Sequence, residues 1–136
     1  MERILIENGA NDPSLGINIA LGWLNDHRGG YAVMDNKKAL MDSLGLRTDS
    51  QFKEYQRTMS GHGIHFAWRR GRGKNALPCS GAVAALFPTK WLIDEMEGGN
   101  LNAMMVVGWA ESDFRQWADE NDPETMFITK KKYRIH

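Results

Sequence analysis

The sequence has very little cysteine and no long hydrophobic run. Cys79 is the only cysteine among 136 residues, so the chain cannot form an internal disulfide, and this usage is typical of a reducing compartment. No apolar stretch approaches the roughly 20 residues that span a bilayer, and the first residues lack the apolar region of a signal peptide. We therefore expect a protein of the cytoplasm with no membrane partner.

The chain also has no net charge, but its charges are unevenly distributed. It contains 17 Lys or Arg and 17 Asp or Glu. Residues 55–93 contain no acidic residue, whereas residues 94–124 contain nine acidic residues and one basic residue. An acid-free stretch can present positive potential to a phosphate-bearing ligand even in a neutral molecule. The charge pattern thus indicates the chemistry of a partner without naming a reaction.

Length and composition are those of one ordinary globular domain. A chain of 136 residues, 42% hydrophobic and 25% charged, can bury one core without disulfides or metals. Disordered and fibrous classes are therefore excluded. We predict a single α/β domain over residues 1–124, and residues 125–136 as a basic C-terminal tail or a final strand.

Short apolar strands and amphipathic helices alternate at least four times. Strands are predicted at 3–6, 31–34, 64–68, 82–87 and 103–107. The last two have no polar alternation, which is typical of strands covered on both faces. The pattern predicts a small Rossmann-like three-layer sandwich, with a mostly parallel sheet of about five strands and helices on both faces. Residues 69–81 are either a hairpin loop, which would make one strand antiparallel, or a crossover without a helix.

The carboxyl ends of the predicted strands supply the first candidate site residues. In open α/β sheets, ligands bind beyond these ends, where loops lead into helix N-termini. The rule selects the turns at 8–14, 88–90 and 108–112, in which Gly9 would let the backbone approach a ligand closely. Each residue also has a structural alternative: a helix cap for Asn11 or Asp12, a tight turn for Gly9, and core packing for Trp109. The candidates are Asn8, Gly9, Asn11, Asp12, Ser14, Thr89, Lys90 and Trp109.

A basic, glycine-rich loop supplies the second set. Arg69, Arg70, Arg72 and Lys74 surround two glycines, and guanidinium forks match phosphate oxygens. The loop is not a Walker A motif, because Gly73-Lys74 is followed by Asn75 rather than Ser or Thr, and no G-x-G-x-x-G follows the first strand. The alternative is a solvated loop of ordinary positive charge.

No pattern marks a metal site or a catalytic residue. Glu7, with the Asn8-Gly9 turn, resembles the glutamate-glycine turn that begins Toprim phosphoryl-transfer sites, but the D-x-D pair that would hold Mg²⁺ is missing. His62 and His65 point to opposite faces of an extended segment, and no third ligand has a typical zinc spacing. We expect no metal, and the sequence assigns neither a cofactor nor a catalytic group.

Three functions fit these residues. The first is a domain that binds a phosphorylated small ligand, in the first place a nucleotide, between the turn at 8–14 and the loop at 69–74. The second is nucleic-acid association, with that loop and the tail at 130–134 on backbone phosphates. The third is a protein-interaction or regulatory module without a ligand. Complementary charged faces would also permit a head-to-tail homo-oligomer.

Overall fold

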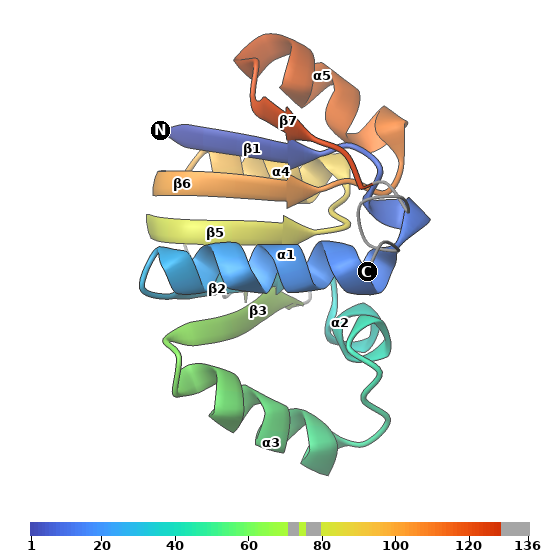
Figure 1. Cartoon of the computed structure of the whole chain (residues 1–136), viewed down its shortest axis with the longest axis vertical. Helices are drawn as coiled ribbons and strands as arrows, with labels where there is room; N and C mark the ends of the chain where they lie inside the picture. Colours follow the sequence, from blue (N-terminus) through green and yellow to red (C-terminus); the bar gives the residue numbers. More distant parts are fainter. Residues whose placement is uncertain (71–73, 76–79, 129–136) are drawn as a thin grey trace, which may run out of the picture.

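A seven-stranded sheet runs through the middle of the molecule and carries helices on both faces (Figure 1). The computed structural model describes residues 1–70, 74–75 and 80–128. The strand order is β4-β3-β2-β5-β6-β1-β7. The strands are β1 (Glu2–Ile6), β2 (Gly30–Met34), β3 (Ile64–Arg70), β4 (Lys74–Asn75), β5 (Ser80–Leu86), β6 (Asn100–Val107) and β7 (Glu124–Met126).

The helices divide between the two faces of the sheet. Strand residues of one parity, such as Ile6 and Met105, pack with α1 (Pro13–Asp26), α2 (Lys37–Ser43) and α3 (Asp49–Ser60). Residues of the other parity, such as Leu5, pack with α4 (Lys90–Glu97) and α5 (Glu111–Asn121). A 3-10 turn, η1 (Gly9–Asn11), precedes α1. The Rossmann-like three-layer prediction is therefore confirmed.

Two short strands make the sheet wider than the sequence indicated. β4 pairs antiparallel with the end of β3, so that Arg70 lies opposite Lys74, and the other six strands are mutually parallel. β5 lies beside β2 rather than β3, and no helix lies between β3 and β5 in the part of the chain that the structure describes. The described residues of 69–81 therefore include one antiparallel pair, β3 with β4, whereas β5 is parallel to its neighbours β2 and β6. β7 adds a parallel strand beside β1.

The carboxyl edge of the sheet has two switch points, where neighbouring strands feed helices on opposite faces. β1 leads to α1 and its neighbour β6 leads to α5, which packs on the other face. β2 leads to α2 and its neighbour β5 leads to α4, again on opposite faces. Such points are where open α/β sheets form ligand crevices.

Candidate functional site

The predicted site residues that the structure describes lie at or near the carboxyl ends of parallel strands, but they do not form one cluster. The turn at 8–14 follows β1, and Arg69 and Arg70 end β3. β2, β5 and β6 lie between these two strands, which places them about 19 Å apart at the usual strand spacing. The turn at 8–14 and the end of β3, which we predicted to form one site, therefore lie at two separate parts of the same edge. Arg72 and the tail at 130–134 lie outside the described residues.

At the β1/β6 switch point the backbones of two turns touch. A Cβ atom on Gly9 would lie 2.7 Å from the carbonyl oxygen of Gly108, closer than real Cβ contacts. The side-chain amide of Asn8 donates to the Ile128 carbonyl (2.6 Å) and accepts from the Ile128 N–H (2.7 Å). Asp12 caps α1 by accepting from the Leu15 N–H (3.2 Å). These groups therefore make contacts that stabilise the fold. In this turn, only the side chains of Asn11 and Ser14 are exposed.

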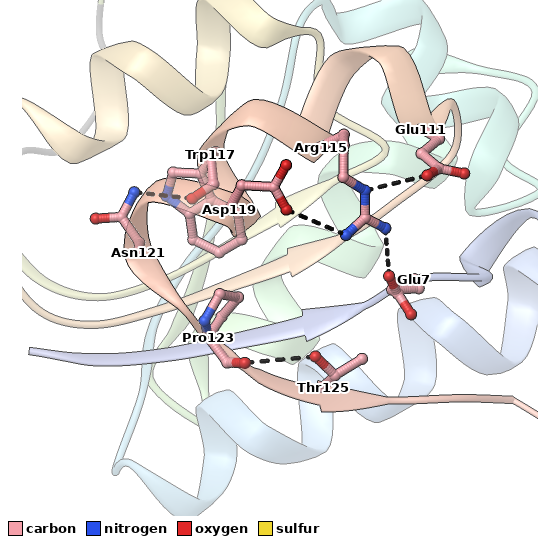
Figure 2. A network of polar contacts seen from close by, with 8 residues as sticks. All are labelled: Glu7, Glu111, Arg115, Trp117, Asp119, Asn121, Pro123 and Thr125. Carbon is pink, nitrogen blue, oxygen red and sulfur yellow. Dashed lines mark hydrogen bonds and ion pairs between the residues drawn. The ribbon is translucent and has the colours of Figure 1, made fainter.

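Carboxylates dominate the charge beside this switch point (Figure 2). Arg115 of α5 binds Glu7 at the end of β1, and its Nε donates to Glu111 at 3.1 Å. Asp119 lies 3.8 Å from the same guanidinium. The hydrogen bond to Glu7 raises the pKa of Arg115. Because three carboxylates surround one cation, this crevice is unfavourable for a phosphate.

The β2/β5 switch point is closed by hydrogen bonds between its own loops. Asp35 accepts from the Thr89 hydroxyl (2.7 Å) and from the Thr89 N–H (3.0 Å). The same hydroxyl accepts from the Leu92 N–H and caps α4. The Lys90 ammonium donates to Gln116 at 2.8 Å. Thr89 and Lys90 therefore both have partners within the protein.

An exposed tryptophan and a half-buried phenylalanine form an aromatic pair between the two switch points. Trp109 is 55% exposed, so the alternative that it packs in the core is wrong. Its ring meets Phe87 edge to face, with ring centroids 5.3 Å apart. Phe87 has a φ of 50°, in the left-handed region that side chains other than glycine rarely adopt and that is often found at functional sites. The pair offers an apolar surface on which a planar group could stack.

A hollow at this edge lies between α2 and the start of α3, and we call it the α2–α3 hollow. Asn36 accepts from the Ala39 N–H (2.8 Å) and so begins α2, which puts two lysines in the first turn. A Schellman motif ends α2, in which the Leu46 N–H bonds to the Met41 carbonyl at 2.9 Å. Gly45, with a φ of +73°, supplies the left-handed residue of that motif. The hollow of about 520 Å³ is lined by Lys37, Lys38, Met41, Asp42, Leu46, Arg47 and Asp49.

Two of the three cations in the α2–α3 hollow are free to bind a ligand. The Lys37 ammonium lies 3.3 Å from Asp49 and over the Trp68 ring, 5.9 Å from its centroid. Within residues 1–70, 74–75 and 80–128, the side chains of Lys38 and Arg47 have no ion-pair partner. Trp68 directly precedes Arg69 in β3, so this contact of Lys37 places the hollow near the carboxyl end of β3. The sequence signal that could have identified this corner is a pair of lysines directly after a helix cap at the end of a strand.

Metal and membrane sites find no support in the described part of the chain. There, no three His, Cys, Asp or Glu side chains gather in an arrangement that could hold a metal ion. The ring of His65 contacts the tilted ring of Tyr31, with ring centroids 5.5 Å apart, and Cys79 lies outside the described residues. None of the described helices combines the length and the hydropathy needed to cross a membrane.

Comparison with known proteins identified no relative of this chain. No family model matches the chain, and searches of curated proteins and of solved structures gave no significant match.

Proposed function

We propose that the protein binds a phosphorylated small ligand of nucleotide size in the α2–α3 hollow, at the carboxyl edge of its sheet. One observation carries the proposal: Lys38 and Arg47, without ion-pair partners among the described residues, line a hollow of about 520 Å³. Small-molecule sites usually have volumes of about 300–1,000 Å³. The hollow therefore combines a suitable size with unpaired cations.

Each side of the hollow suits a different part of such a ligand. The Arg47 guanidinium can bind two phosphate oxygens at once, and the Lys38 ammonium adds a point charge. Met41 and Leu46 give apolar surface for the uncharged part. Asp42 and Asp49 lower the local positive potential, so binding depends on direct pairing with Lys38 and Arg47. The proposal is one of binding and includes no reaction.

Calorimetric titration with nucleoside phosphates and sugar phosphates tests the proposal. At least one compound should bind saturably, and Lys38→Ala or Arg47→Ala should weaken it about tenfold, as expected for the loss of one charge-assisted hydrogen bond. The matched control is Lys53→Ala, which removes an exposed lysine of α3 outside the hollow. Absence of binding by every compound, or equal affinity in all three variants, would overturn the proposal.

Nucleic-acid binding is the second candidate, because the positive surface extends beyond the hollow. Lys53 and Arg57 are exposed on α3, and residues 37–75 contain nine Lys or Arg against three Asp or Glu. Contacts with backbone phosphates would weaken steeply with salt and would not depend on sequence. In that case Lys53→Ala would weaken the binding of oligonucleotides as much as Lys38→Ala does. The same set of variants therefore separates the two candidates.

A further inference from the structure

The charges that alternate along the sequence lie at opposite ends of the sheet in the fold. We call α2, α3, β3 and β4 the basic end and α5 with β7 the acidic end; in Figure 1 they occupy the bottom and the top of the long axis. Residues 37–70 and 74–75, the described part of the basic end, contain eight Lys or Arg and three Asp or Glu. Residues 111–124, at the acidic end, contain six Asp or Glu and one Arg. The protein has no net charge, but one end of its sheet is therefore positively charged and the other end is negatively charged.

The two ends are too far apart to neutralise each other within one molecule. Seven strands give six spacings, or about 29 Å from β4 to β7. Exposed charges are largely screened beyond about 8 Å at physiological ionic strength. Each end therefore presents its own electrostatic potential to solvent. The oppositely charged end of another copy is one surface that can neutralise it.

The acidic end has exposed carboxylates and exposed apolar groups together. Asp119, Glu120, Asp122 and Glu124 are all exposed. The single cation there, Arg115, already binds Glu7, Glu111 and Asp119 (Figure 2). Next to these carboxylates, Met126 is 39% and Phe127 is 56% exposed. No described residue pairs with the outer side of β7. This end therefore has a charge excess of one sign and an open strand edge.

The basic end offers a complementary surface on α3. Lys53 and Arg57 are four residues apart and therefore share one face of the helix, and both are exposed. With His65 and Phe66 of β3 they line a hollow of about 360 Å³. No ion-pair partner for either cation lies within the described ranges. The hollow on α3 can thus receive an acidic projection without first breaking an ion pair.

We propose that copies of this protein associate head to tail, with the acidic end of one copy against the α3 hollow of the next. The contact joins two different surfaces, so it leaves one free surface of each kind and can repeat. Opposite potentials at the two surfaces would speed association and disfavour contacts between like ends. The inference does not depend on ligand binding, because Lys53 and Arg57 lie outside the α2–α3 hollow.

Sedimentation velocity over a range of protein concentrations and salt concentrations tests this proposal. The wild-type protein should form concentration-dependent oligomers at low salt that dissociate at high salt. The double variants Lys53→Glu/Arg57→Glu and Asp119→Lys/Glu120→Lys should each be monomeric, because each reverses the charge of one of the two contacting surfaces, so that like charges then face each other. An equimolar mixture of the two variants should associate again, since the contacting surfaces of the two different variants carry opposite charges.

Two further variants make the result specific. Asn25→Lys/Asp26→Lys places positive charge on two exposed residues at the end of α1, away from both ends, and should leave association unchanged. Lys38→Ala should also leave association unchanged, whether or not it affects ligand binding. Thermal melting of the reversal variants confirms that they are folded. The proposal is overturned if the wild type stays monomeric at low salt, or if its oligomers survive salt and both reversals.

Discussion

Arg3 and Glu97 form a two-point ion pair that joins the first strand to the end of α4. The Nε of Arg3 lies 3.0 Å from Oε2 of Glu97, and its second contact, from a terminal nitrogen to Oε1, is 2.6 Å. The indole N–H of Trp117 in α5 donates to the same carboxylate at 2.7 Å. Both charged side chains are only about a quarter exposed. One carboxylate thus connects β1, α4 and α5.

Replacing Glu97 by alanine should destabilise the protein by about 2 kcal/mol, since Arg3 and Trp117 would both lose their acceptor. The bond from Arg3 lowers the pKa of Glu97, although burial opposes the shift. A lowered folded pKa means that this stabilisation is present above the ordinary value of 4.5 and is lost as pH falls through the folded pKa. Urea unfolding of wild type and Glu97→Ala, at neutral and acidic pH, measures the effect.

The control for Glu97 is Asp94→Ala, which removes an exposed carboxylate from the same helix. Its free energy of unfolding should change by less than about 0.5 kcal/mol. The wild type and Glu97→Ala should also become more alike in stability in acid. A constant difference between them at every pH would contradict the assignment of the ion pair.

His27 should make stability depend on pH in the opposite sense. Its Nδ1 lies 2.8 Å from the Trp23 carbonyl and its Nε2 lies 2.9 Å from Glu2. The bond to Trp23 is the main cause that raises the pKa of His27, and Glu2 adds to it. A raised folded pKa gives a stabilisation that is fully present below the ordinary value of 6.5 and is lost as pH rises through the folded pKa.

Thermal melting across that pH range tests the prediction for His27. His27→Gln should remove the decline in melting temperature that the wild type shows as the histidine loses its proton. Glu2→Gln should reduce the decline without abolishing it, because the Trp23 carbonyl still accepts a hydrogen bond. If His27→Gln kept the wild-type pH dependence, the histidine would not be its source.

The fold could be predicted from the sequence where an element is long enough to show a pattern. The unbroken apolar runs of β5 and β6 predicted strands buried on both faces, and the structure buries them there. β4 has two residues and β7 has three, too few for periodicity to decide between a strand and a loop or tail. The local sequence pattern therefore predicted the three layers. The number of strands in the sheet depended on pairing between segments that are distant in the sequence.

The candidate site depended even more on distant pairs. Asn8 looks like a ligand contact in its own turn, but its amide partner, Ile128, is 120 residues away. Thr89 likewise bonds to Asp35, 54 residues earlier. No local rule predicts such partners. The separation of charge into two ends was equally hidden, because it follows from a strand order in which β3 and β7 lie far apart.

Two glycine substitutions with equal space around them should have opposite effects on stability. A Cβ atom on Gly45 or on Gly22 would meet nothing within 4 Å. Gly45 has a φ of +73°, so Gly45→Ala should cost about 1 kcal/mol. Gly22 lies inside α1, where alanine is favoured by about 0.5–1 kcal/mol. Urea denaturation should therefore separate the two variants by about 2 kcal/mol.

The Gly45 variant also tests how the α2–α3 hollow is built. The Schellman motif at Gly45 directs the chain toward Arg47, so Gly45→Ala should weaken ligand binding in addition to lowering stability. Gly22→Ala, distant from the hollow, should bind as the wild type does. If both variants shifted stability in the same direction, the backbone conformation of Gly45 would not be the cause.

The glycine at position 9, just after β1, has two possible explanations: close approach of a ligand, or close packing against the neighbouring turn. A glycine that admits a ligand could be replaced by alanine with loss of affinity and little loss of stability. A Cβ atom on Gly9, however, would lie 2.7 Å from both the Gly108 oxygen and Val107 Cγ1. Gly9→Ala should therefore cost about 1–3 kcal/mol, the usual range for overpacking, with or without a ligand. The matched control is Gly98→Ala, whose Cβ atom would make only 3.6 Å contacts, and it should change stability little. Equal free energies of unfolding for the two variants would instead favour the explanation that Gly9 admits a ligand.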